Sequence, residues 1–195
     1  MANTDTPFGF KPIEHLNGNP WNGKTRVYYI PSTDNTAVFI GDPVKSAGAA
    51  DTTGKFPTVA QAAAGELIRG VAIAFSDQPY VAFDTTNQLR TYRPASTAMY
   101  AFVVDDPDVI FEIQEDSVGN SITTAMVGLN TDITVGSGST STGISAVELD
   151  SSDTATAAGQ CKMLGLVDRP DNELGNNAKW KVLIVEHEMR STTDI

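Results

Sequence analysis

The chain has 195 residues and a formal net charge of -11 at pH 7, with 24 acidic and 13 basic side chains. A surface this acidic repels phosphate backbones, which excludes direct nucleic-acid binding as the expected activity. Its one cysteine cannot form an internal disulfide, and no apolar run approaches the roughly 18 residues needed to span a bilayer. We therefore expect one domain, with no membrane partner, made in a reducing cytoplasm.

Residues 1–25 are expected to form an extended N-terminal arm, because they combine aromatic side chains with the turn formers Gly, Asn and Pro. Phe8, Phe10 and Trp21 lie in this arm. Aromatic anchors of this kind either pack on their own domain or dock on a neighbouring protein. The β-rich domain is expected to cover residues 26–195.

From residue 26 onward, short runs of β-branched and aromatic residues are separated by clusters of Pro, Gly, Asp and Asn, which predicts a mainly β fold. The expected strands are 27–30, 37–40, 70–75, 100–104 and 109–114. In the last of these, alternate residues are apolar, which predicts a half-buried strand.

One segment departs from the β pattern. Apolar side chains recur at spacing i, i+3, i+4 and i+7, which predicts one short helix; they are Ile122, Ala125, Met126 and Leu129. Residues 58–64 are rich in alanine and are compatible with either helix or strand. Residues 136–143, GSGSTSTG, predict a flexible loop, followed by a further strand over 144–149.

The strongest apolar runs lie between Cys161 and Glu188. Residues 163–167 and 180–185 are rich in Val, Leu and Ile, and the loop between them begins with a run of turn formers that includes Pro170. This pattern predicts strand, loop and strand. The segment carries no recognisable catalytic group, so we interpret it as scaffold.

Residues 18–25, GNPWNGKT, match the phosphate-loop pattern G-x-x-x-x-G-K-[ST]. A phosphate loop follows a buried strand and opens a helix, whose N-terminus holds the phosphates. Here a β-type run over 26–30 follows the motif, and Pro20 removes a backbone donor. We interpret the motif as part of a turn-rich arm. A nucleotide-binding protein would instead be stabilised by ATP and Mg²⁺ through Lys24.

Other chemical groups give weak signals. The sequence Asp105-Asp106-Pro107-Asp108 offers oxygen ligands but lacks the glycine and distant glutamate of a calcium loop, so an acidic turn is expected and no metal site is predicted.

The groups that catalysis would need are equally sparse. His15 and His187 belong to no catalytic motif, and the flanking glutamates suggest a solvated strand end for His187. Cys161 is expected to be a small core residue. Glu112 and Glu115 could pair as carboxylates, but pairing is common among 24 acids. No enzyme activity and no cofactor are predicted.

Several strings of this sequence resemble a family of tailed-bacteriophage structural proteins found as head cement or decoration proteins. They are TPFGFKPIEHLNGNPWNGKTRVYYIP, FIGDPVK, VGSGSTSTGISAVELD and LGLVDRPDNELGNNAKWKVLIVEHE. The resemblance implies a small β domain of jelly-roll or β-barrel type, made in a bacterial host and bound to the outer capsid surface. Its implied partners are the major capsid protein and further copies of itself, as a dimer or trimer.

If this resemblance holds, the expected contact residues are Phe8, Phe10, Trp21, Tyr28 and Tyr29, because aromatic side chains supply much interface energy at low entropic cost. The alternative is that Trp21 and Tyr28 cover the protein's own core. A second function class also stays open, namely a β-sandwich on the virion that binds host glycans by stacking sugars on Trp21 or Tyr80.

Overall fold

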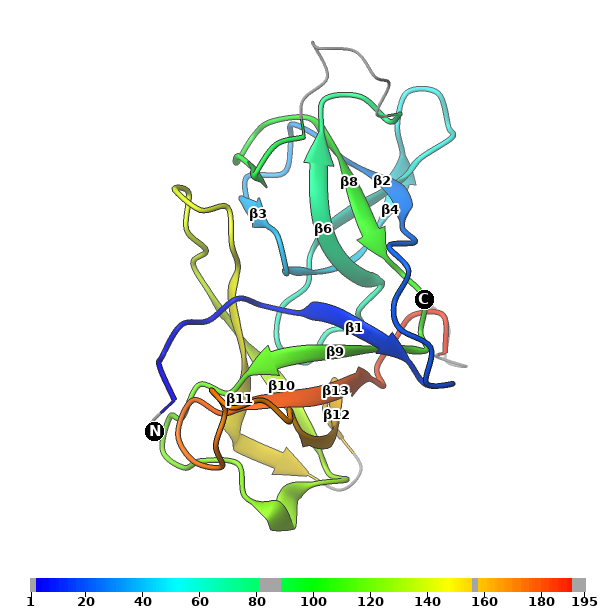
Figure 1. The fold of residues 1–195 in the computed structure, drawn as a ribbon. Helices are drawn as coiled ribbons and strands as arrows, with labels where there is room; N and C mark the ends of the chain where they lie inside the picture. Colours follow the sequence, from blue (N-terminus) through cyan, green and yellow to red (C-terminus); the bar gives the residue numbers. More distant parts are fainter. Residues whose placement is uncertain (1–2, 81–88, 156–157, 191–195) are drawn as a thin grey trace.

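The computed structural model describes residues 3–80, 89–155 and 158–190. It is mainly β, as predicted, and consists of a closed barrel standing on a larger sheet (Figure 1). The barrel strands, in spatial order, are β2 (Arg26–Ile30), β5 (Pro57–Gln61), β4 (Pro43–Ala50), β6 (Gly70–Ser76) and β8 (Met99–Val104). The sheet strands, in spatial order, are β1 (Lys11–His15), β9 (Val109–Gln114), β13 (Lys179–Ile184), β12 (Cys161–Leu166), β10 (Asn130–Gly136) and β11 (Ala146–Ala155).

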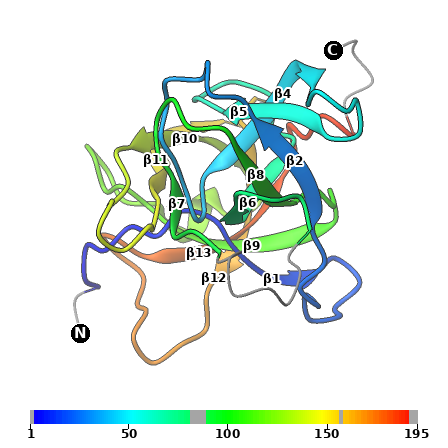
Figure 2. The same cartoon turned by 90° about the horizontal axis from the view of Figure 1, so that it is seen from above.

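The barrel is filled by side chains that alternate along its strands. In β2, Tyr28 and Ile30 are buried inside while Tyr29 lies on the outside. The barrel closes through one parallel pair, Tyr29 opposite Thr58, and its other strand pairs are antiparallel. A small two-stranded sheet pairs β3 (Val38–Phe39) with β7 (Tyr92–Arg93). Figure 1 shows β3 beside the barrel, and the view from above shows β7 beside β6 (Figure 2).

The six-stranded sheet carries the second core. Strands β12 and β13 pair antiparallel, which confirms the predicted strand, loop and strand of the last third. Strand β9 lies between β1 and β13 and is buried along its whole length, so its predicted half-burial is wrong. On its second face the arm covers Gln114: the Gln114 amide donates to the Thr4 carbonyl (2.8 Å), and the Thr6 N–H donates to Gln114 Oε1 (2.9 Å).

The predicted helix over 122–129 is also wrong, since only a 3₁₀ turn forms, over Thr124–Met126. Its backbone groups bond to the sheet instead. The Gly128 N–H donates to the Met163 carbonyl (2.9 Å), and the Met163 N–H donates to the Leu129 carbonyl (3.0 Å). Gly128 also has a φ of +89°, which an α-helix does not accept.

Two segments that the sequence did not assign to a regular element with certainty have a defined place in the structure. In the alanine-rich segment 58–64, for which helix and strand were both compatible, the first four residues belong to strand β5. Residues 137–145 connect β10 to β11, and the strand expected over 144–149 begins at Ala146 and runs to Ala155. Residues 3–25 of the predicted arm include β1, which pairs with β9, so this part of the arm belongs to the sheet.

A buried polar cluster ties the barrel to the segment that follows β13. We define it as Tyr28, Arg69, Asp105, His187 and Glu188. Arg69 Nε donates to the Tyr28 hydroxyl (2.8 Å), which donates to Asp105 Oδ2 (2.8 Å). Burial and the bond to Asp105 raise the pKa of Tyr28 to about 12. Glu188 lies 3.8 Å from Arg69 Nη1.

Candidate docking groove at the junction of barrel and sheet

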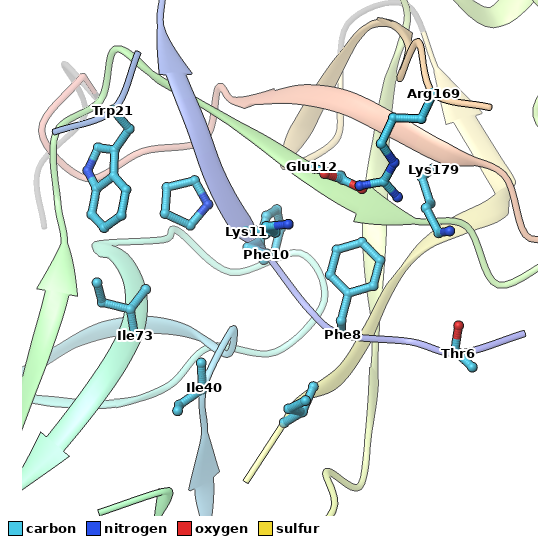
Figure 3. Close-up of a pocket in the computed structure, with 12 residues that line it drawn as sticks. Thr6, Phe8, Phe10, Lys11, Trp21, Ile40, Ile73, Glu112, Arg169 and Lys179 are labelled. Carbon is cyan, nitrogen blue, oxygen red and sulfur yellow. The ribbon is translucent and has the colours of Figure 1, made fainter. Parts of the chain in front are cut away.

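A groove of about 520 Å³ opens where the barrel meets the sheet, and the N-terminal segment runs through it (Figure 3). We call it the junction groove. Its walls come from the arm, from both layers of the fold and from the loop between β12 and β13. The lining residues are Thr6, Phe8, Phe10, Lys11, Pro12, Trp21, Ile40, Ile73, Glu112, Ile144, Arg169 and Lys179.

A close crossing of two glycines sets the position of the arm in this groove. The Phe10 N–H donates to the Gly41 carbonyl (2.9 Å), and the Gly41 N–H donates to the Ala72 carbonyl (2.8 Å). A Cβ on Gly9 would lie 2.5 Å from the Gly41 oxygen, and a Cβ on Gly41 would lie 2.5 Å from the Phe8 oxygen. Only glycines allow this approach, which brings the arm against the barrel before it enters β1.

Trp21 and Ile73 form one end of the groove, where the side chains are apolar (Figure 3). The Trp21 backbone is fixed because its N–H donates to the Ile13 carbonyl (3.1 Å). The indole Nε1 is buried and has no hydrogen-bond partner among the described residues. An unpaired buried donor costs about 1–3 kcal/mol.

Charged side chains form the other end, beyond Phe8 (Figure 3). Arg169 Nη1 pairs with the buried Glu112 Oε1 at 2.8 Å, and Lys179 Nζ lies 3.4 Å from Asp171 Oδ2. Lys11 is exposed and makes no ion pair with any residue of the described ranges. The groove therefore carries a locally positive rim on a chain whose net charge is -11.

The five predicted contact residues do not form one surface. Phe8 and Trp21 line the groove and are partly exposed, whereas Phe10 is 2% exposed and packs edge-on against Phe111, with ring centroids 5.7 Å apart. Tyr28 is buried in the barrel core, as the alternative interpretation held. Sequence reasoning missed the charged lining residues. These residues come from three distant parts of the chain, and no motif links them: Lys11, Glu112, and Arg169 with Lys179.

Tyr29 lies in a different place, in a row of aromatic rings on the outside of the barrel. The ring centroids of Tyr29 and Tyr100 are 5.2 Å apart, those of Tyr100 and Phe56 are 5.3 Å apart, and those of Phe56 and Tyr80 are 5.9 Å apart. Tyr80 is 69% exposed. We call these four residues the aromatic row.

The GNPWNGKT segment has the geometry of a turn between strands. The Gly18 N–H donates to the His15 carbonyl and the His15 N–H to the Asn19 carbonyl, both at 2.8 Å. Strand β2 follows directly, so a helix N-terminus does not follow the motif. The backbone donors of a phosphate loop are therefore not arranged around Lys24.

The acidic residues 105–108 form the turn between β8 and β9, as predicted. The Val109 N–H donates to the Asp106 carbonyl (3.2 Å), and the Asp108 N–H donates to Asp106 Oδ1 (3.0 Å). Asp105 points into the polar cluster, where Arg26 Nη1 lies 3.2 Å from it. Within the described ranges, no group of three His, Cys, Asp or Glu side chains is placed to hold a metal ion.

The expected position of His187 at a solvated strand end is wrong. Its side chain is 1% exposed, and its Nδ1 accepts a hydrogen bond from the Met189 N–H (3.1 Å). Burial and the nearby Arg69 lower its pKa to about 4. The flanking glutamates misled the sequence interpretation, because Glu188 itself turns inward and accepts from the Ser46 N–H (2.7 Å).

The other nucleophilic and acidic candidates have structural roles. Cys161 is buried in the sheet core, which confirms its predicted place, and burial raises the pKa of its thiol. Glu112 pairs with Arg169, and Glu115 accepts the Ile122 N–H (2.6 Å). Each carboxylate thus has its own partner.

Comparison of the chain with protein-family models, with curated proteins and with solved structures finds no match in any of the three. Across the described ranges, the structure contains no helix that is both long enough and apolar enough to cross a lipid bilayer.

Proposed function

We propose that this protein is a head cement protein of a tailed bacteriophage, which binds the outer capsid surface and bridges neighbouring major capsid subunits. The observation that carries the proposal is the junction groove, in which the predicted contact residues Phe8 and Trp21 stand at the surface beside a charged rim. A groove with aromatic walls and a polar rim has the composition of a protein-docking site. The role is structural and involves no catalysis.

The proposed mechanism is thermodynamic linkage. A protein that binds only the expanded, assembled shell stabilises that shell by mass action. Contacts with several subunits add avidity even when each contact is weak, and a dimer or trimer at a capsid symmetry axis would multiply them. The net charge of -11 suits a protein that must bind a protein shell and not the DNA that the shell packages.

The test is co-sedimentation with capsids from the phage that encodes this chain, prepared without it, before and after expansion. We expect saturable binding to expanded shells at a fixed ratio to the major capsid protein, and no binding to unexpanded shells. Equal binding to both forms would contradict stabilisation of the expanded state. Binding to neither form would exclude the cement role.

A second candidate function is recognition of host glycans from the virion surface, and the aromatic row favours it. Tyr80 is exposed and ends a row of four rings, and exposed aromatic rings can stack against sugar faces. Trp21 is less suitable because it is partly covered at the junction groove. A glycan array would decide: binding that is lost in Tyr80→Ala but kept in Trp21→Ala supports this function, and no binding to any glycan excludes it.

A further inference from the structure

We infer that the junction groove takes an extended segment of a partner protein in which one acidic residue is flanked by large apolar residues. The inference rests on the proposed function, since the capsid protein would supply this segment. It adds the chemistry of the segment, which the resemblance to cement proteins does not give.

The apolar part of the inference comes from the groove walls. Trp21, Ile40 and Ile73 line one end, and Phe8 stands between the two ends (Figure 3). Ile144 also lines the groove. Ile144 is among the exposed large apolar residues of the chain, and Phe8 and Trp21 are partly exposed. A groove of about 520 Å³ falls within the size range that holds a ligand of several side chains. Apolar side chains of a partner would cover this surface.

The acidic part comes from the charges of the rim. Lys11, Arg169 and Lys179 line the groove together with one carboxylate, Glu112, which Arg169 already neutralises. Asp171 lies 3.4 Å from Lys179, so Lys11 is the one of these three cations that has no ion-pair partner among the described residues. A carboxylate beside Lys11 would complete the pairing. Because the chain is acidic overall, this local positive charge would orient an acidic segment in one register.

Strand β1 borders the groove but is a poor template for adding a strand. Pro12 has no N–H to offer, and the Ile13 carbonyl already accepts from the Trp21 N–H. Recognition would therefore depend on side chains rather than on a continuous backbone ladder.

Three blocked pentapeptides test the chemistry without a capsid: Gly-Leu-Asp-Phe-Gly, Gly-Leu-Lys-Phe-Gly and Gly-Gly-Asp-Gly-Gly. Trp21 fluorescence reports binding, since the second tryptophan, Trp180, is buried in the sheet core. We expect the acidic apolar peptide to bind about fivefold more tightly than the basic one, as one exposed ion pair allows. The peptide without apolar residues should bind more weakly than either.

The variant Lys11→Glu should reverse the preference between the acidic and basic peptides. Lys55→Glu is the matched control, because Lys55 is exposed on a barrel loop outside the groove and the net charge changes equally. Equal binding of acidic and basic peptides, an equal effect of the two variants, or no binding of any peptide up to about 5 mM would overturn the inference. Self-association of the chain that Lys11→Glu abolishes, without peptide binding, would also overturn it in favour of a second copy.

Shell binding separates this inference from the proposed function. If wild-type protein binds expanded shells and Lys11→Glu binds them equally well, the cement role stands and the groove inference fails. If wild-type protein binds no shell but discriminates between the peptides, the groove inference stands and the cement role fails.

Discussion

The hydroxyl oxygen of Tyr28 lies 2.8 Å from Asp105 Oδ2, to which it donates a hydrogen bond, and it accepts another from Arg69 at the same distance. Tyr28 belongs to the barrel core, and the Ile68 N–H beside Arg69 donates to the Glu186 carbonyl (2.9 Å) after β13. Arg69 Nη1 also lies 3.8 Å from Glu188 Oε2, so the Tyr28 hydroxyl belongs to the polar cluster that joins the barrel to the segment after β13.

Replacing Tyr28 by Phe should lower the free energy of unfolding by about 1–3 kcal/mol, because the buried Asp105 carboxylate loses a donor. Tyr29→Phe is the matched control on the neighbouring residue. Its hydroxyl makes no hydrogen bond within the described ranges, so its loss should cost less than about 0.5 kcal/mol. Urea unfolding measures both variants, and an equal loss in the two would contradict the role given to Tyr28.

Arg93 is buried completely and donates to carbonyls of Pro31, Asp34, Thr36 and Thr97, at distances of 2.5–2.9 Å. Its replacement by Met removes one donor from each of these carbonyls, of which those of Pro31 and Asp34 keep a backbone donor, the N–H groups of Asp34 and Ser96.

We expect Arg93→Met to cost about 3–5 kcal/mol, the usual loss when one side of a buried charged network is removed. Arg90→Met removes an exposed arginine that pairs with Asp77 (2.8 Å) and should cost less than about 1 kcal/mol. Thermal unfolding should therefore separate the two variants widely. Similar melting temperatures would show that the hydrogen bonds from Arg93 to the four carbonyls contribute little to stability.

His187 should make the fold less stable in acid. Its folded pKa of about 4 lies below the ordinary value of 6.5, so the unfolded chain binds the proton more strongly. The contribution of the neutral ring is complete above pH 6.5 and is lost as pH falls from about 6.5 toward 4. His187→Gln should show a shallower fall in unfolding free energy over this window. An NMR titration of the His187 ring should give a midpoint near pH 4, and a midpoint near 6.5 would refute the prediction.

Asp42 should change the stability with pH in the opposite direction to His187. Burial raises the pKa of its carboxyl to about 6, so the folded state holds the proton more strongly than the unfolded chain. Its stabilising contribution is complete below pH 3.8 and is lost as pH rises toward 6. The pH dependence of the wild type is thus a sum of opposing slopes, and the difference between wild type and His187→Gln isolates the histidine.

Gly41→Ala should disturb the arm. Gly41 has a φ of +98°, and an added Cβ would lie 2.5 Å from the Phe8 carbonyl oxygen, so strain and overpacking together should cost roughly 3 kcal/mol. Gly23→Ala has a comparable φ of +84° but no atom within 4 Å of the added Cβ, so it should cost about 1–2 kcal/mol. Chemical unfolding compares the two, and equal costs would mean that the crossing is not tightly packed.

The sequence predicts the fold best where side-chain chemistry and local structure agree. Strands β12 and β13 carry dense Val, Leu and Ile and could be predicted. Strand β4 could not be predicted, because most side chains of its KSAGAA segment are small and its last residues are exposed. It is a strand because its backbone pairs with β5 and β6. The helical spacing over 122–129 is real, but backbone bonds to β12 override it.

In the junction groove, too, some lining residues could be predicted from the sequence and others could not. Phe8 and Trp21 could be predicted as surface aromatics, because they stand among turn formers. Lys11 and Arg169 could not be brought together, since β1 and the loop after β12 meet only through the pairing of β1, β9 and β13. The pattern of side chains along the sequence does not indicate that β9 pairs with both β1 and β13.

The strand order has a consequence for synthesis of the chain. All five barrel strands lie within residues 26–104, whereas β9 takes β1 from before the barrel and β13 from well after it. During synthesis the barrel can close as soon as residue 104 has left the ribosome. The edge of β9 that pairs with β13 stays unpaired until β13 has been made. An open strand edge invites pairing with another nascent chain. Dense polysomes should therefore be the setting in which this protein is most prone to aggregate.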